Sequence, residues 1–270
     1  MITDTQKILD SMIESISEMR EVQAIGMSGS KSPLPAAGEG DIDIFIYCSC
    51  IPDPAAREAA LKNVEGRLEG ININTFQGGH WGTGDLVHIN GVETWLMYFT
   101  VSEASSELDA ILEGRYPDKV DNYYFPIGRC AMLRSINVLY DRNTFLCSIK
   151  KRLNEYPDSL AGILIQYHLS ELEDTEDLER AAARKDVMFY HFALDIALDH
   201  FLQALFALNR CYFPSRKRSL EHIENFSLKP EGCSERLLET VRLGSSSDGI
   251  ARSYGLWSDL VKDLGKLCSR

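Results

Sequence analysis

The stretch Ser28-Gly29-Ser30-Lys31-Ser32-Pro33, followed at a distance by Asp41-Ile42-Asp43-Ile44-Phe45-Ile46-Tyr47, decides how the N-terminal half of the chain folds. The first segment is rich in breaker residues and follows a short apolar run at 22–27, whereas the second combines β-branched and aromatic residues. This order predicts a strand, a loop and a second strand. Residues two apart in a strand point to the same side, so the two aspartates are expected on one face, about 6–7 Å apart, with the isoleucines facing the core.

Two carboxylates on one strand face suit hard divalent cations, which prefer oxygen ligands. Phosphoryl and nucleotidyl transfer depend on such ions, because the ions clamp the attacking and leaving oxygens. Asp41 and Asp43 are therefore candidate ligands of a divalent metal ion. The structural alternative is a pair of surface aspartates on a half-exposed strand, a pattern that charge alone produces often.

Gly29-Ser30, a ten-residue spacer and Asp41-Ile42-Asp43-Ile44 together resemble the DNA polymerase β-like nucleotidyltransferase superfamily. In that family the glycine permits close backbone approach to a nucleoside triphosphate, the serine binds its outer phosphates, and the aspartates hold magnesium. The resemblance implies these roles here, with ATP or another nucleoside triphosphate as donor. Lys31 would lie beside the phosphates and offset their charge. The alternatives are an ordinary turn at Gly29-Ser30 and a solubilising loop lysine.

The family also places a third carboxylate on a later strand, where it supports the metals and often activates the acceptor hydroxyl. The matching segment is residues 92–98, and the usual aspartate position falls on Trp95. Glu93 lies two residues earlier, so a strand would direct it to the same face as Trp95, and it is the candidate replacement. The alternative is a glutamate that merely flanks the hairpin turn expected at Asn90-Gly91.

The C-terminal half resembles the helical domain of the antibiotic-type branch of that superfamily. The similarity rests on residues 204–210, on Tyr212-Phe213-Pro214 and on Lys217. Such bundles complete the nucleotide and acceptor cleft, so the resemblance implies that Asn209, Arg210 and Lys217 line it. Helix capping or a surface position is the alternative for each of them.

The pattern of apolar residues predicts an α+β fold with two domains. Helical spacing in residues 8–19 is followed by strand-like runs at 22–27, 41–47, 71–76, 86–89, 92–101 and 135–140, with a helix expected at 56–69. Long helical patterns then take over at 159–172 and 184–208. We expect a nucleotidyltransferase domain with a mixed sheet and flanking helices at 1–147, and a helical acceptor- and nucleotide-binding domain at 148–270.

Composition narrows the classes of partner. The formal charge of −12 and the absence of a basic stripe argue against a polymeric nucleic acid as partner, although a bound cation would still let a pocket hold a nucleotide. Seven scattered cysteines without zinc spacing predict free thiols, and Cys48 and Cys50 are read as structural. No apolar stretch reaches about 18 residues, so no membrane span is expected and a cytoplasmic location is predicted.

These patterns lead to one functional hypothesis and two alternatives. The first is a magnesium-dependent transfer of a nucleoside monophosphate, AMP from ATP, to a hydroxyl of a small-molecule or protein acceptor. The second is a catalytically inactive nucleotide-binding or interaction protein, which Trp95 would explain. The third is a toxin–antitoxin component with a HEPN-like bundle, since Arg216 and His222 resemble the Arg and His pair of those ribonucleases.

Overall fold

The computed structural model describes residues 4–29, 33–64, 68–121 and 124–269. Contacts between residues divide the chain into two compact units. The N-terminal unit comprises Met1–Asp109 and Met132–Glu155, and the C-terminal unit comprises Ala110–Ala131 and Tyr156–Arg270. The predicted division into a catalytic domain at 1–147 and a helical binding domain at 148–270 stays a prediction.

Six strands within the described residues form one mixed sheet in the order β3-β4-β5-β2-β1-β6. β2 and β5 run parallel, and the other neighbouring strands run antiparallel. The strands are β1 (Val22–Met27), β2 (Ile42–Cys48), β3 (Leu68–Gln77), β4 (Thr83–Ile89), β5 (Val92–Thr100) and β6 (Asn137–Asp141).

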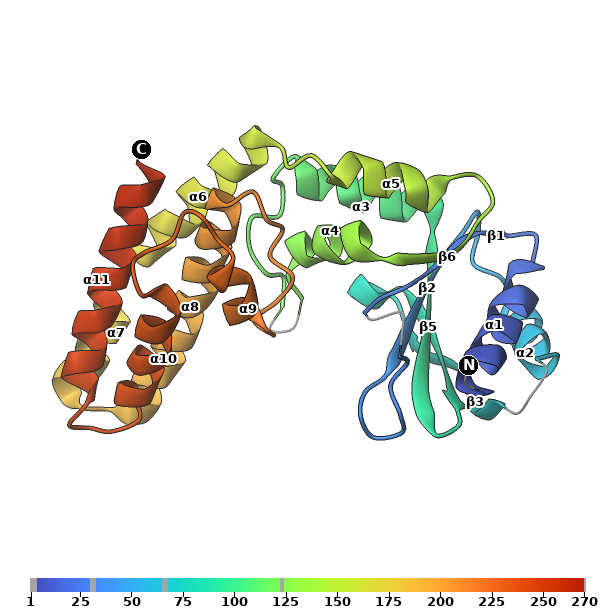
Figure 1. Ribbon diagram of the computed structural model, residues 1–270, viewed down its shortest axis with the longest axis horizontal. Helices are drawn as coiled ribbons and strands as arrows, with labels where there is room; N and C mark the ends of the chain where they lie inside the picture. The colour runs from blue at the N-terminus through green and yellow to red at the C-terminus, as the bar shows by residue number, and fades with distance from the viewer. Residues whose placement is uncertain (1–3, 30–32, 65–67, 122–123, 270) are drawn as a thin grey trace. The chain divides into compact units, whose positions relative to one another are not determined.

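Helices surround this sheet and make up the C-terminal region (Figure 1). The predicted α+β fold, a mixed sheet with flanking helices followed by a helical region, is confirmed. The helices are α1 (Asp4–Ser17), α2 (Pro54–Lys62), η1 (Gly79–Trp81), α3 (Val101–Leu112), α4 (Pro126–Ser135), α5 (Phe145–Leu153), α6 (Asp158–Leu172), α7 (Glu176–Arg184), α8 (Val187–Leu208), α9 (Ser219–Glu224), α10 (Cys233–Gly244) and α11 (Ile250–Cys268).

One face of the sheet is covered by α1 and α2 and carries the core of the N-terminal unit (Figure 1). The helix α2 begins where Pro54 occupies its first turn and Asp53 accepts a hydrogen bond from the Ala56 N–H at 3.0 Å. The core combines the buried face of α1 with alternate residues of β2 and β5, among them Met12, Ile16, Ile44, Ile46 and Leu96. The odd-numbered residues of β2, including Asp43, therefore lie on the opposite face.

The predicted helix at 56–69 is too long. α2 ends at Lys62, and β3 begins at Leu68 and pairs with β4. Pairing with a neighbouring strand outweighs the weak local helix propensity of this segment. The helices α3 and α4 were not singled out from the sequence.

The C-terminal unit is built around α8, which begins after Asp186 accepts a hydrogen bond from the Phe189 N–H at 3.1 Å. Phe201 of α8 packs against Trp257 of α11 with ring centroids 5.4 Å apart. Within the described residues α8 is the one helix long and apolar enough to cross a membrane, and most of it is buried inside the unit. Such burial is typical of the core helix of a water-soluble protein, while the cytoplasmic location stays a prediction.

Candidate nucleotide and metal site on the sheet

The carboxylates of the Asp-x-Asp pattern lie at the beginning of β2. Asp41 is exposed and directly precedes the strand, and Asp43 is half-buried within it. The isoleucines between and after them are buried in the core on the opposite face. The predicted alternation is thus present within β2, with Asp43 on the face opposite the core, and Asp41 directly precedes the strand.

The loop after β1 is held against the backbone of Asp43. The Ser28 N–H donates to the Asp43 carbonyl at 3.0 Å, and the Asn137 side-chain amide donates to the Gly29 carbonyl at 2.9 Å. Gly29 has a φ of +78°, which glycine adopts without strain, and a Cβ at this position would meet no atom within 4 Å. Among the described residues, the backbone at Gly29 is therefore open on the side where a Cβ would point. Ser30 and Lys31 lie outside the described residues, so their predicted roles stay predictions.

Trp95 stands where the resemblance expects the third carboxylate. In the parallel pair of β2 and β5, Trp95 is the register partner of Asp43, so both side chains share one face of the sheet. The indole is half-buried and packs against Phe76, with ring centroids 5.9 Å apart. A residue that cannot ligate a hard cation thus occupies the position beside Asp43.

Glu93 provides a carboxylate one step along the same face. It is exposed at the start of β5, two residues before Trp95. The parallel register begins with Ile42 paired to Thr94, so Glu93 and Asp41 are the residues directly before this first pair. Neighbouring strands lie about 4.8 Å apart, which lets side chains at this end of the two strands reach a common ion or hydroxyl.

The predicted hairpin before β5 is present. β4 and β5 pair from Ile89 and Val92 onward, and Asn90 and Gly91 both have positive φ. This is the backbone that Asn-Gly favours in a tight hairpin turn.

The remaining predicted nucleotide-binding residues belong to the C-terminal unit. Asn209 follows α8, and its side-chain amide donates to the carbonyls of Leu205 and Leu228 at 2.9 and 2.7 Å. Its side-chain oxygen accepts from the Leu228 N–H at 3.0 Å. These three bonds give Asn209 a structural role, because they link the end of α8 to the segment at Leu228. Lys217 is exposed. Nucleotide binding by either residue stays a prediction.

The Arg and His pair of the third functional hypothesis is engaged in other contacts. Arg216 forms ion pairs with Asp195 and Asp199, and its hydrogen bond to Asp199 is the main cause that raises the pKa of its guanidinium. His222 packs its ring against Phe206 with centroids 5.4 Å apart. A guanidinium neutralised by two carboxylates is poorly disposed to bind an RNA phosphate, which disfavours the ribonuclease hypothesis.

A cavity of about 430 Å³ lies elsewhere in the N-terminal unit. It is lined by residues at the C-terminal end of β5 and on α3, including Tyr98, Phe99, Glu103 and Glu107. Asp43 and Glu93 lie at the opposite end of the pair formed by β2 and β5, so this cavity is separate from the predicted site.

Cys48 and Cys50 do not form a reactive pair. Both are free thiols, Cys48 is buried, and burial raises its pKa to about 12. The Cys48 thiol is therefore protonated at neutral pH, which agrees with the structural interpretation of this residue.

Comparisons with known proteins address the fold. Residues 124–218 match a family described as a domain of unknown function (DUF4037), and a comparison with curated protein sequences gives no match. A nucleotidyltransferase-like protein from Exiguobacterium sibiricum, solved by crystallography, is similar to the chain with a TM-score of 0.50 and 12% identity. The similarity covers 98% of this chain and 78% of that one. The chain therefore shares the fold of a nucleotidyltransferase-like protein.

Proposed function

We propose that the chain is a magnesium-dependent nucleotidyltransferase that moves a nucleoside monophosphate, AMP from ATP, to a hydroxyl of a small-molecule or protein acceptor. One observation carries the proposal. Asp41 and Asp43 lie two residues apart at the beginning of β2, and Ser28, which precedes the open backbone at Gly29, donates its N–H to the Asp43 carbonyl. Carboxylates next to an exposed, ligand-accessible loop are what a metal-bound triphosphate requires.

The donor set fits Mg2+. This ion usually keeps several waters and is held by one or two carboxylates together with substrate phosphates. An exposed Asp41 and a half-buried Asp43 supply two hard oxygen donors and leave room for waters and phosphates on the solvent side. A magnesium ion bound there would offset the charge of the triphosphate and of the departing pyrophosphate.

The side chains and backbone have distinct roles in the proposed transfer. The loop at Gly29 positions the triphosphate, and Asp41 and Asp43 orient its phosphates through the metal. The acceptor oxygen bonds to the α-phosphorus, the bond from that phosphorus to the bridging oxygen breaks, and pyrophosphate leaves. Glu93, which directly precedes the first register pair of β5 with β2, takes the hydroxyl proton.

A screen of label transfer tests this proposal. Four α-labelled nucleoside triphosphates with Mg2+ are offered against aminoglycosides, lincosamides, other polyols and lysate protein. We expect the label to appear in one acceptor class with wild-type protein and to fall at least about 100-fold with Asp41→Asn or Asp43→Asn, since losing a metal ligand removes several kcal/mol of charge stabilisation. Equal transfer by these variants would contradict the metal assignment.

A second candidate function is favoured by Trp95, which holds the place beside Asp43 where a carboxylate is expected. In this alternative the protein binds a triphosphate without turning it over. Calorimetry would then show metal-dependent triphosphate binding, while the label-transfer screen stays negative across all acceptor classes. A protein that neither binds triphosphate nor transfers label would contradict both functions.

A further inference from the structure

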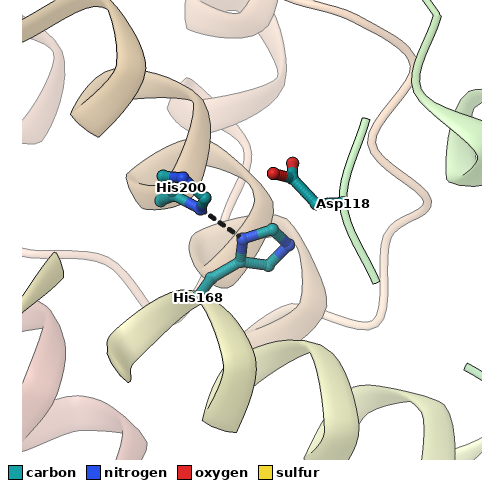
Figure 2. Close-up of side chains that lie close together, drawn as sticks. All are labelled: Asp118, His168 and His200. Carbon is teal, nitrogen blue, oxygen red and sulfur yellow. Dashed lines mark hydrogen bonds between the residues drawn. The ribbon is translucent and has the colours of Figure 1, made fainter. Parts of the chain in front are cut away.

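Two buried histidines meet inside the C-terminal unit. His168 of α6 is 0% exposed and His200 of α8 is 6% exposed, and their Nδ1 atoms lie 2.9 Å apart. Figure 2 shows the rings meeting at these nitrogens, with Asp118 approaching from a separate segment. One ligand atom from each of the three residues falls within 4.8 Å of the other two.

The two Nδ1 atoms are close enough either to share a hydrogen bond or to bind a common ion. If both rings are neutral, one Nδ1 donates to the other. His168 Nε2 is buried and has no hydrogen-bond partner within the described residues. An ion that replaces the hydrogen bond between the rings would take the lone pairs of both Nδ1 atoms and leave the His168 proton on the buried Nε2.

The charges around the pair also leave a place for a cation. Asp199, the next residue before His200, is neutralised by Lys119 at 2.6 Å and by Arg216. Asp118 has no cationic partner among the described residues. Its carboxylate accepts a hydrogen bond from the buried Gln203 side chain at 3.0 Å, which fixes its orientation. The oriented carboxylate of Asp118 thus stands beside the two imidazoles without a cation to offset its charge among the described residues.

We propose that Asp118, His168 and His200 bind a divalent transition-metal ion of the zinc type. Imidazole and carboxylate ligands favour such ions over magnesium. Two nitrogen ligands about 2.0–2.1 Å from a tetrahedral ion lie about 3.3–3.4 Å apart, so the two Nδ1 atoms, 2.9 Å apart, need to separate by only a few tenths of an ångström to hold one. Gln203 then acts as the outer partner that orients a ligating carboxylate.

This site is independent of the proposed nucleotide function, because all of its residues belong to the C-terminal unit. Three protein ligands leave at least one coordination position for water or another small ligand, the pattern of zinc sites that are not purely structural. The sequence alone did not indicate this metal site, because its ligands come from three separate segments and no two of them have the spacing of a helical metal-binding pair.

Titration of metal-free, full-length protein with Zn2+ tests the proposal. Calorimetry is performed in excess Mg2+, so that Asp41 and Asp43 do not compete, and Co2+ is used in parallel because its visible spectrum distinguishes nitrogen and oxygen ligands from thiolates. We expect one Zn2+ per chain, a higher melting temperature with the ion, and a Co2+ spectrum without thiolate bands. A wild-type protein that binds no Zn2+, or binds Co2+ through thiolates alone, would overturn the proposal.

Variants locate the ion. His168→Asn should weaken Zn2+ binding at least about 100-fold, since even an outer-shell change costs about 10–100-fold. His191→Asn is the matched control, because it removes another histidine of α8 and should bind as wild type. Asp118→Asn keeps a side-chain oxygen that can accept the hydrogen bond from Gln203. Its Zn2+ affinity therefore tests the assignment if His168→Asn fails to fold. Wild-type affinity in a folded Asp118→Asn or His168→Asn protein would refute the assignment.

Discussion

Replacement of Glu93 by glutamine removes one negative charge and preserves the length of the side chain. Glu93 directly precedes the first register pair, Ile42 and Thr94, and lies two residues before Trp95, the register partner of Asp43. A positioned base contributes about 10²–10⁴-fold to a rate, which corresponds to about 2.7–5.4 kcal/mol of activation free energy. Because Glu93 is exposed, the change in folding free energy should stay within about 0.5 kcal/mol.

Initial rates of label transfer measure this effect under saturating triphosphate. We expect kcat to fall about 10²–10⁴-fold in Glu93→Gln, with little change in the affinity for triphosphate and a wild-type melting temperature. Glu69→Gln provides a matched control, since Glu69 is another exposed glutamate of the same sheet, on β3. Full activity in Glu93→Gln would refute the assignment of the base.

A companion variant separates a displaced carboxylate from a missing one. Trp95→Asp places a carboxylate beside Asp43 at the cost of the contact with Phe76, an aromatic pair worth about 0.5–1.5 kcal/mol beyond its buried area. If Glu93 is the base, the wild-type protein transfers label without a carboxylate at position 95. If the protein is inactive, Trp95→Asp is the variant expected to gain metal-dependent turnover, and Glu93→Gln changes nothing.

Three further outcomes follow from the site and the buried charges. Ser30→Ala should raise the KM for triphosphate more than it lowers kcat, because a contact to the outer phosphates acts mainly in binding; steady-state kinetics measures this, and a wild-type KM returns Ser30 to an ordinary turn. Asp85 is 0% exposed and pairs with Arg57 at 2.6 Å. Arg57→Leu leaves this buried carboxyl without its cationic partner, so denaturant titration should show a free energy of unfolding lower by about 3–5 kcal/mol. A loss below about 1 kcal/mol would contradict this expectation. In metal-free protein, the depressed pKa of His168, caused first by burial and then by His200, gives stability that is fully present above about pH 6.5 and decreases toward pH 4, by up to roughly 3 kcal/mol; a His168→Gln variant with the same pH dependence would contradict it.

Much of the fold could be predicted from local sequence patterns. The alternation in Asp41 to Tyr47 indicated a strand with carboxylates on one face, and Asn90-Gly91 indicated the hairpin that sets the register of β5. The end of α2 could not be predicted, because it depends on the pairing of β3 with β4, which joins residues far apart in the sequence. The grouping of residues 110–131 with the C-terminal unit is also set by tertiary contacts.

The candidate site divides in the same way. Asp41, Asp43 and Gly29 could be named because their roles depend on spacing within a few residues. The position of Trp95 beside Asp43 follows from the parallel pairing of β2 and β5. Local patterns do not predict this pairing, and only the family resemblance pointed to it. The buried pair of Arg57 and Asp85 and the cluster of Asp118, His168 and His200 gave no local signal, since each joins distant segments.

Calorimetric titration of ATP into the protein tests the central claim, that Asp41 and Asp43 form the metal site for a triphosphate. We expect binding in Mg2+, none in EDTA, and at least about tenfold weaker binding by Asp43→Asn, while Asp10→Asn, an exposed carboxylate of α1, binds as wild type. The same ATP affinity with and without Mg2+, or in wild type and Asp43→Asn, would contradict the account.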